Sequence, residues 1–350
     1  MSGETESRKG EHINIVLQQD VAAKGVMAGF ERFFLEHMAM PEVDLDEIDL
    51  SLTLWGKKLQ APLLISSMTG GTEPAQSINL HLAEAAQALG VAMGVGSQRA
   101  AIERDDLTYT YQVRKVAPDI LLLANLGAVQ LNYGYGIDQA RRAVETIEAD
   151  ALILHLNSLQ EAVQPQGDRD WCHLYDKIAS LAVQLEVPIV VKEVGNGISA
   201  AVARRLADVG VDAIDVAGAG GTSWSEVEAH RQPDPIRARI AHSFAGWGIP
   251  TALALLEVRR EVPELPIFAS GGIRSGIDVA KAIALGATLA GSAAPLLEPA
   301  TNNAQAVYQK FAAVIEELRI AAFCTGSPNL EALRRAKLRR TDTWEIINRN

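Results

Sequence analysis

The sequence predicts an α/β fold in which eight strand–helix units close into a barrel. Eight short apolar runs, each as long as a buried parallel strand, follow one another along the chain. Segments with helical periodicity lie between them, and several end in a glycine placed to stop a helix: Gly90, Gly210 and Gly286. This repeated alternation is typical of a single (β/α)8 TIM barrel, and a doubly wound open sheet is the less favoured alternative.

The expected elements divide the chain into an extension and a barrel. Strands are expected at residues 62–66, 91–95, 120–125, 151–155, 188–192, 213–216, 266–269 and 288–291. Helices are expected at residues 79–89, 174–185, 200–209 and 279–285. Residues 1–61 would then form an N-terminal extension that caps the barrel, and residues 62–350 would form the barrel itself with a C-terminal helix.

Two segments outside the strand–helix repeat also carry a pattern. Residues 50–55 alternate apolar and polar side chains and then break at Gly56, which predicts a hairpin under the barrel. Residues 305–340 follow a helical pattern with a basic end, and we expect this end to be solvated.

Composition excludes several classes of function. The chain has 350 residues, of which 48% are hydrophobic and 21% are charged, as in an ordinary globular protein. Its net charge of −11 argues against nucleic acid or an anionic membrane as a general partner. If the protein binds an anionic ligand, its cations must therefore be gathered locally.

The chain lacks the sequence signs of export or membrane insertion. No apolar run reaches the ~18 residues that span a bilayer, and the polar N-terminus has no apolar segment of the secretory type. One disulfide between Cys172 and Cys324 could not stabilise a fold of this size, and neither cysteine lies in a C-x-x-C pair. We therefore expect a protein of the reducing cytoplasm.

In a barrel of this kind the active site lies at the carboxyl ends of the strands, and every predicted strand end here is polar or rich in glycine. Gly271 and Gly272 follow the seventh strand, and Gly291 and Ser292 end the eighth. Glycine loops at these two places, each followed by a helix start, favour a phosphate site. Tight turn geometry alone is the structural alternative.

Lys192 ends an apolar strand, so its stem should be buried and its ammonium should face the cavity. It is a candidate for a Schiff-base lysine or for a fixed cation beside a flavin ring, and a structural salt bridge is the alternative. Thr69 and Asn125 are suitable to bind the edge of a heterocycle, but either could equally satisfy local backbone groups.

A second group of residues suggests an anion and a metal. Arg8, Lys9, Ser97 and Arg99 are candidates for a second anion site, although Arg8 and Lys9 alone would be solvated tail charges. His155 ends a strand and is a candidate functional histidine. Gln160 precedes Glu161, whose carboxylate could hold Mg²⁺ or could simply begin a helix. The histidines show no zinc-ligand spacing.

At these residues the chain resembles the type 2 isopentenyl-diphosphate isomerases. The segments that carry the resemblance, in order from residue 8, are RKGEHI, SSMTGG, GVGSQRA, NLGA, HLNSLQEAVQPQGD, VKEVGNG, AGAGGTSW, SGGIRSGIDVAKAIALGA and GSAAP. HLNSLQEAVQPQGD together with VKEVGNG is the most specific part, because many FMN barrels share segments like SGGIR. Ser158 and Gln166 depart from the pattern, which puts only the detail of their loop in doubt.

The resemblance implies FMN, Mg²⁺ and NADPH as the reductant. Carried over by position, the FMN contacts are Ser67, Met68, Thr69, Ser97, Asn125, Lys192, Thr222, Gly272, Ile273, Arg274, Ala293 and Ala294. The diphosphate contacts are Arg8, Lys9, Ser97, Gln98, Arg99, His155 and Gln160, and Glu161 is the expected Mg²⁺ ligand.

The implied reaction interconverts isopentenyl and dimethylallyl diphosphate by a 1,3-allylic proton shift, with reduced FMN as acid and base. Gln160 and His155 would place the substrate, and Lys192 would favour the anionic reduced flavin. A radical route stays open. The resemblance also implies a homo-oligomer, a tetramer or an octamer.

Several alternatives remain. Another FMN-barrel oxidoreductase acting on a phosphorylated substrate is the nearest one. Inosine-monophosphate dehydrogenases need a cysteine that this chain lacks in its glycine-rich loops, and hydroxy-acid oxidases need a late histidine and arginine where this chain has Ser270-Gly271-Gly272. A Schiff-base aldolase and a flavin carrier without turnover are the other candidates.

Overall fold

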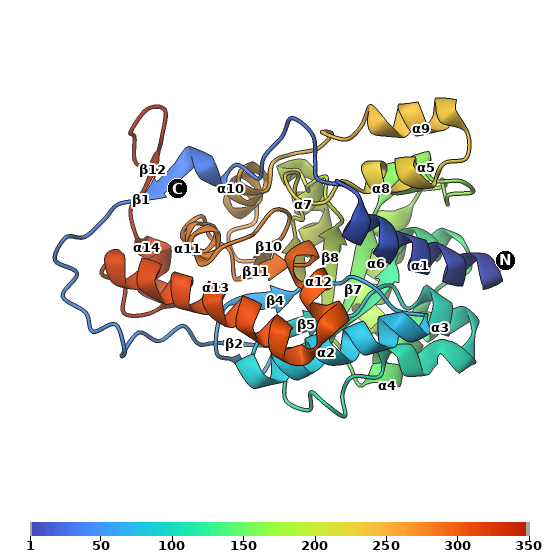
Figure 1. The fold of residues 1–350 in the computed structure, drawn as a ribbon, viewed down its shortest axis with the longest axis horizontal. Helices are drawn as coiled ribbons and strands as arrows, with labels where there is room; N and C mark the ends of the chain where they lie inside the picture. The colour runs from blue at the N-terminus through green and yellow to red at the C-terminus, as the bar shows by residue number, and fades with distance from the viewer. Residues whose placement is uncertain (1, 348–350) are drawn as a thin grey trace.

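Eight parallel strands close into a barrel in the computed structural model, which describes the backbone of residues 2–347 and the side chains of residues 9–347 (Figure 1). The strands are β4 (Leu63–Ile65), β5 (Ala92–Gly94), β6 (Leu122–Gly127), β7 (Ala151–Leu156), β8 (Ile189–Glu193), β9 (Ala213–Asp215), β10 (Ile267–Ala269) and β11 (Leu289–Ser292). Because β11 pairs with β4 and β10 pairs with β9, the ring is closed and the open-sheet alternative is wrong. The predicted barrel and all eight strand positions are confirmed.

Helices surround the ring, and the four predicted ones are present. These are α2 (Glu73–Leu89), α6 (Leu174–Gln184), α7 (Ala200–Asp208) and α11 (Gly276–Ala284). The helix α2 begins earlier than predicted, because the Thr72 hydroxyl accepts a hydrogen bond from the Ala75 amide at 3.2 Å and Pro74 suits the first turn. Gly90, Gly210 and Gly286 have φ of 63°, 86° and 107°, as expected where a helix stops.

The remaining helices connect and cover the strands. They are α1 (Ser2–Gln18), α3 (Arg99–Glu103), α4 (Ile137–Ile147), α5 (Ser158–Val163), α8 (Trp224–Arg231), α9 (Pro235–His242), α10 (Thr251–Glu261), α12 (Ala294–Asn302), α13 (Ala304–Cys324) and α14 (Leu330–Arg335), with the 3₁₀ turns η1 (Phe30–Arg32), η2 (Asp105–Tyr111) and η3 (Ala128–Asn132). Within the described residues, none of these helices has the length and apolar character needed to cross a bilayer.

The predicted hairpin is present and closes the barrel from below. Its strands are β2 (Leu52–Leu54) and β3 (Lys57–Leu59), and the turn between them has positive φ at Trp55 and Gly56. Leu54 and Leu59 pack against inward-facing residues near the amino ends of the strands, which are Leu64, Ala92, Leu121, Leu123, Ala151, Ile153, Val190, Ala213, Phe268 and Leu289. The hairpin is therefore part of the barrel core.

The C-terminal segment differs from the prediction. One helix was expected over residues 305–340, but α13 ends at Cys324 because Gly326 takes φ of 64° and Pro328 follows. After α14, the strand β12 (Leu338–Arg340) pairs antiparallel with β1 (Phe33–Leu35) of the extension. The basic end is not simply solvated, since the Arg339 guanidinium binds the Glu36 carboxylate with a shortest distance of 2.5 Å.

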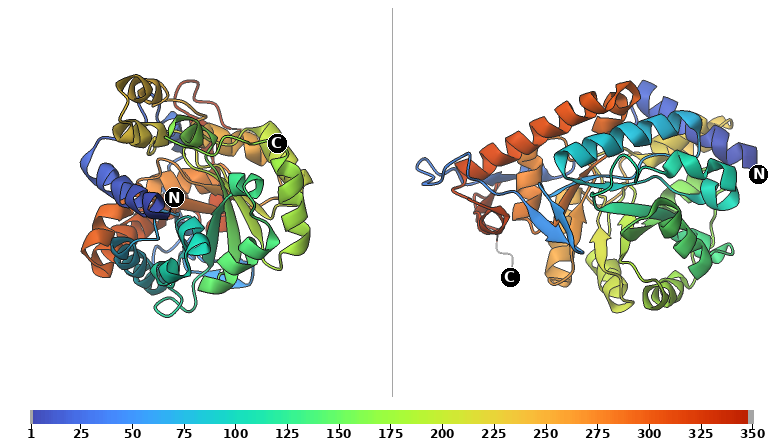
Figure 2. Two further views of the ribbon diagram at one scale, coloured as in Figure 1. Left: turned by 90° about the vertical axis from the view of Figure 1, so that its right-hand side faces the viewer. Right: turned by 90° about the horizontal axis from the view of Figure 1, so that it is seen from below.

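The helix α1 lies across the end of the barrel where the strands finish (Figure 2). It contacts α3, α8 and α12, so the N-terminal extension covers the mouth at one end and supplies the hairpin at the other. The extension is thus joined to the barrel at both ends.

We expect Leu59→Ala to destabilise the protein by about 2–5 kcal/mol, because Leu59 is fully buried among barrel residues and its loss leaves a cavity. Guanidinium denaturation followed by circular dichroism measures the change. Lys58→Ala on the same strand is the control, since Lys58 is exposed. Equal stability of the two variants would show that the hairpin is not part of the core.

Candidate active site

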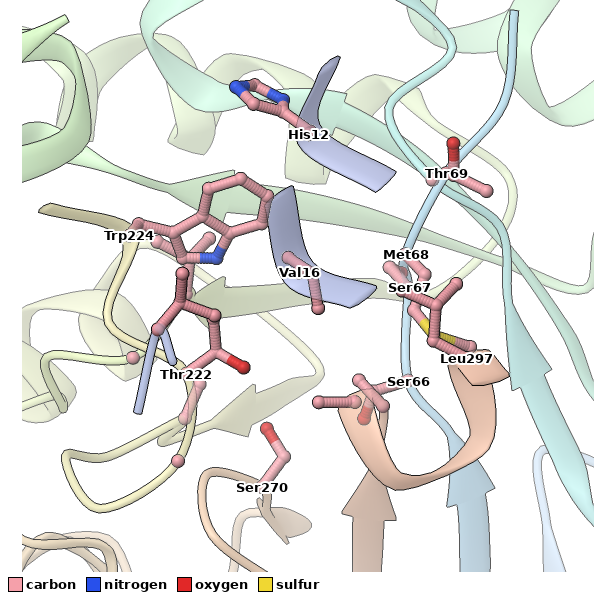
Figure 3. Close-up of a pocket in the computed structure, with 18 of the residues that line it drawn as sticks. His12, Val16, Ser66, Ser67, Met68, Thr69, Thr222, Trp224, Ser270 and Leu297 are labelled. Carbon is pink, nitrogen blue, oxygen red and sulfur yellow. The ribbon is translucent and has the colours of Figure 1, made fainter. Parts of the chain in front are cut away.

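A cavity of about 560 Å³ opens at the carboxyl ends of the strands, beneath α1. Residues that follow all eight strands line it, together with residues of α1 (Figure 3). The predicted site residues that line it are Lys9, Ser67, Met68, Thr69, Ser97, Arg99, Asn125, His155, Gln160, Glu161, Lys192, Thr222, Gly272, Ile273, Arg274, Ala293 and Ala294. The structure therefore brings nearly all of the predicted site residues to one cavity.

Among the described residues, Gln98 is the predicted substrate residue that does not line the cavity. The side chain of Arg8 lies outside the described residues. Gln98 is buried in the wall, where its Nε2 donates to the Ala143 carbonyl at 2.9 Å and its Oε1 accepts from the Asn125 amide at 2.9 Å. The Gln98 side chain therefore joins Asn125 of β6 to α4, and contact of Gln98 with the diphosphate stays a prediction.

The glycine loop after β10 combines close packing with a helix start. Gly271 and Gly272 have φ of 99° and 78°, and a Cβ at Gly271 would lie 2.2 Å from the Gly218 carbonyl oxygen. The Ser275 hydroxyl then caps α11 by accepting from the Asp278 amide at 3.2 Å. Packing thus explains the glycines, and their loop also lines the cavity next to the start of α12 at Ala294, a setting suited to a phosphate.

Ser66 and Ser67 offer hydrogen-bonding groups to a polar ligand in the cavity. Both hydroxyl oxygens are buried, line the cavity and have no hydrogen-bond partner among the described residues. A buried hydroxyl without a partner costs about 1–3 kcal/mol. Figure 3 shows them beside Met68 and Thr69 on the segment that follows β4. This wall, with the cradle after β10 and β11, fits a cofactor that has both a heterocycle and a phosphate.

Lys192 forms a buried ion pair at the end of β8. Its Nζ lies 3.3 Å from Asp215 Oδ2 and donates to the Glu193 carbonyl at 2.8 Å. Asp215 is also bound by the Ser270 hydroxyl at 2.8 Å. Lys192 therefore forms a structural salt bridge and also lines the cavity. The Asp215 carboxylate beside it favours the role of a fixed cation over that of a Schiff-base lysine, which must react as a neutral amine.

Lys9 and Arg99 lie on either side of Ser97, so the described residues of the predicted second anion site lie close together. We call them the cation group. Lys9 Nζ donates to the Ser97 carbonyl at 2.8 Å and to the Tyr111 hydroxyl at 2.5 Å. Arg99 is engaged with two carboxylates, Asp168 at 2.7 Å and Glu103 at 2.7 Å. An anion at this place would have to share Arg99 with the two carboxylates that bind it.

His155 and Asn125 orient each other. Asn125 donates from Nδ2 to the Val95 carbonyl at 3.1 Å, so its Oδ1 faces His155 Nδ1 at 2.8 Å and accepts from it. In the neutral imidazole the lone pair then lies on Nε2. Gly127 lies against this nitrogen, since a Cβ there would be 3.2 Å away, so the glycine leaves the ring room.

Glu161 is buried on the short helix α5, and donors hold both of its oxygens. The Asn157 amide donates to Oε1 at 2.9 Å, and the Asp168 backbone amide donates to Oε2 at 2.7 Å. Among the described residues no group of three or more histidine, cysteine, aspartate or glutamate side chains is arranged around a metal position. A cation here would therefore take one carboxylate from the protein and its other ligands from substrate and water.

Glu228 connects Gln160 to the covering helix α1. Its Oε1 accepts from Gln160 Nε2 at 2.8 Å and lies 3.0 Å from His12 Nε2, while its Oε2 pairs with Arg231 at 2.6 Å. Burial opposes ionisation, but the hydrogen bond and charge of His12 and the charge of Arg231 outweigh it and lower the pKa of Glu228 to about 2.

Sequence reasoning missed four residues of this site. They are His12, Asn157, Asp215 and Glu228. His12 stands in the RKGEHI segment and Asn157 follows His155 within two residues, so both lay within segments already noted. Asp215 is an acid inside an apolar strand, which is a usable signal. Glu228 lies on an ordinary helix, and only its contacts reveal it.

Comparison with known sequences agrees with this geometry. A model of the family described as FMN-dependent dehydrogenase matches residues 137–340, more than half of the chain, so the fold and site define a member of this flavin-barrel class. Proteins named isopentenyl-diphosphate delta-isomerase are similar along nearly the whole length. That of a Synechocystis species is 66% identical over 334 residues, 95% of this chain and 96% of the relative. That of Stutzerimonas stutzeri is 60% identical over 333 residues, 95% and 96% of the two chains.

The chain belongs to the isopentenyl-diphosphate delta-isomerase family. The resemblance noted in the sequence is thereby confirmed. Solved structures of mandelate oxidase share the fold at low identity. One is 19% identical with a TM-score of 0.63 over 90% of each chain, and this likeness supports the barrel alone.

Glu228→Gln should reduce the pH dependence of the free energy of unfolding below pH 4.5. Because the folded-state pKa of about 2 lies below the ordinary 4.5, the carboxylate stabilises the fold above pH 4.5, and this contribution is lost as pH falls toward 2. The variant should lose on the order of 3 kcal/mol at pH 7. Urea denaturation between pH 3 and 7, at intervals of about one unit, measures it.

The control for this prediction is Glu11→Gln, which removes the half-exposed carboxylate that binds the other side of Arg231. It should change stability by less than about 1 kcal/mol at any pH. A parallel pH curve for Glu228→Gln and the unmodified protein would contradict the role assigned to the ionised Glu228.

Proposed function

We propose that this protein interconverts isopentenyl diphosphate and dimethylallyl diphosphate by a 1,3-allylic proton shift. One observation supports this best: a single cavity holds both a glycine-rich cradle suited to a cofactor phosphate and a separate cation group around Ser97 suited to a diphosphate. The names of the similar proteins agree with this reaction.

FMN is the cofactor that the family implies, and the cavity residues fit it. Gly272, Ile273, Arg274, Ala293 and Ala294 would hold its phosphate end. Ser67, Met68, Thr69, Ser97, Asn125, Lys192 and Thr222 would surround its ring system and side chain. Reduced FMN would supply the acid–base group for the proton shift. The Lys192 ammonium would place a fixed positive charge beside the ring, and Asp215 and Ser270 keep it in place.

The substrate would lie between the carboxyl ends of the strands and α1. Lys9, Arg99 and the neighbouring Arg8 would bind the diphosphate, and Glu161 would hold Mg²⁺ against it. Val16, Trp224 and Leu297 give the cavity apolar walls for the hydrocarbon part and exclude water from the alkene (Figure 3). His155 and Gln160 would position the substrate between the residues that bind its diphosphate and the apolar walls that contact its hydrocarbon part.

Three further parts of the proposal concern the cell and the assembly. NADPH would reduce the flavin before turnover. Both cysteines are unpaired, which agrees with action in the reducing cytoplasm. A homo-oligomer, either a tetramer or an octamer, would cover apolar side chains that the single chain exposes on and near α9, such as Ile236 (63% exposed), Ile240 and Trp247.

The purified protein should carry FMN and should convert isopentenyl diphosphate when NADPH and Mg²⁺ are both supplied without oxygen. The flavin absorbance and the appearance of dimethylallyl diphosphate measure the two parts. Omission of NADPH or of Mg²⁺ should each abolish turnover. Protein that retains no FMN, or that converts no substrate under these conditions, would overturn the proposal.

Lys192→Met should lower kcat about 100-fold, because it keeps the apolar stem and removes a charge from a site with little water. Lys177→Met is the matched control, since Lys177 Nζ binds the Leu131 carbonyl at 2.7 Å away from the cavity. The double variant Lys192→Met with Asp215→Asn removes both charges of the pair. If it folds stably and regains activity, Lys192 is not needed as a cation.

A further inference from the structure

Asn157 has a buried side-chain oxygen that no described residue binds. The residue is 4% exposed, lines the cavity, and its Oδ1 has no hydrogen-bond partner among the described residues. Buried side-chain oxygens of this kind are rare in folded proteins and call for a ligand. The other cavity oxygens in this state, Ser66 and Ser67, lie on the segment after β4, whereas Asn157 lies beyond β7.

The amide of Asn157 can face only one way. Its Nδ2 donates to Gln160 Oε1 at 3.2 Å and to Glu161 Oε1 at 2.9 Å. Both of these atoms are acceptors, so a flipped amide would set its oxygen against two oxygens and lose both bonds. The position of Oδ1 is therefore determined by its neighbours.

Local structure does not explain the residue either. Asn157 occupies the N-cap position of α5, where asparagine usually accepts a hydrogen bond from a backbone amide of the first turn. Here the side chain makes no such bond. Among the described residues the oxygen thus has no partner, and it is available to a ligand in the cavity.

The chemistry of the proposed ligands indicates which group binds Asn157 Oδ1. An oxygen acceptor needs a donor or a cation. A prenyl diphosphate offers only acceptor oxygens and an apolar chain, and Asn157 is not among the residues proposed to surround FMN and its donors. Mg²⁺ bound through one carboxylate keeps several waters, and these are strong donors. Glu161 Oε1, bound to the same amide, places such a cation next to Asn157.

We propose that Asn157 is a second member of the divalent-cation site, with Oδ1 accepting a hydrogen bond from a water on the metal held by Glu161. The inference rests on the proposed function, because it takes Mg²⁺ and a diphosphate as the ligands. In addition, Nδ2 positions Glu161 and Gln160, so one side chain sets both the metal ligand and the substrate-binding amide.

Metal binding itself tests the proposal. Mn²⁺ is titrated into the FMN-loaded enzyme with inorganic diphosphate, and free Mn²⁺ is followed by electron paramagnetic resonance. Asn157→Ala should weaken Mn²⁺ binding about 10-fold or more, as loss of outer-sphere partners usually does. Asn157→Asp replaces the Nδ2 donor with an oxygen that faces Glu161 Oε1 and Gln160 Oε1, so it should also weaken Mn²⁺ binding.

Two comparison variants make the result specific. Glu161→Gln should abolish the binding, and Ser158→Ala, an exposed neighbour, should leave it unchanged. If Asn157→Ala leaves Mn²⁺ binding unchanged while Glu161→Gln abolishes it, the inference is overturned. Because the titration needs no turnover, it reports on Asn157 even if the isomerase assay fails.

Discussion

Closure of the parallel ring is the constraint on which the whole site depends. Parallel strands point the same way, so closing them brings eight carboxyl ends to one mouth. Side chains as distant in sequence as Lys9 and Ala294 therefore line a single cavity. At the opposite end the β2–β3 hairpin inserts Leu54 and Leu59 among the inward-facing strand residues, so the polar mouth rests on a closed apolar core.

Buried and half-buried carboxylates set the orientation of the groups at the mouth. Asp215 holds Lys192, Asp168 holds Arg99, and Glu228 holds Gln160 together with His12. In a protein with a net charge of −11, cations kept at a cavity need such partners, because an unpaired buried charge is costly. The same pairing limits the free positive charge that the cavity offers to a diphosphate.

The N-terminal extension is a working part of this site. The helix α1 contributes Lys9 to the cation group and Val16 to the apolar wall of the cavity. Its His12 binds the carboxylate of Glu228. The β1–β12 pairing and the Glu36–Arg339 ion pair join the rest of the extension to the C-terminal segment. The mouth is thus covered by a helix whose position is tied to the same network that orients Gln160.

The sequence by itself determined the barrel, the strand positions and most of the cavity residues, because buried parallel strands are apolar runs and their ends carry the chemistry. It overextended the C-terminal helix, since helical periodicity does not reveal that residues near 338 pair with a strand near residue 34. Its grouping of Gln98 with Ser97 and Arg99 stays a prediction, and only folding shows that the Gln98 side chain is buried in the cavity wall. Only the tertiary structure decided the roles of Asn157, Asp215 and Glu228, because each acts through contacts with groups whose relative positions exist only after folding.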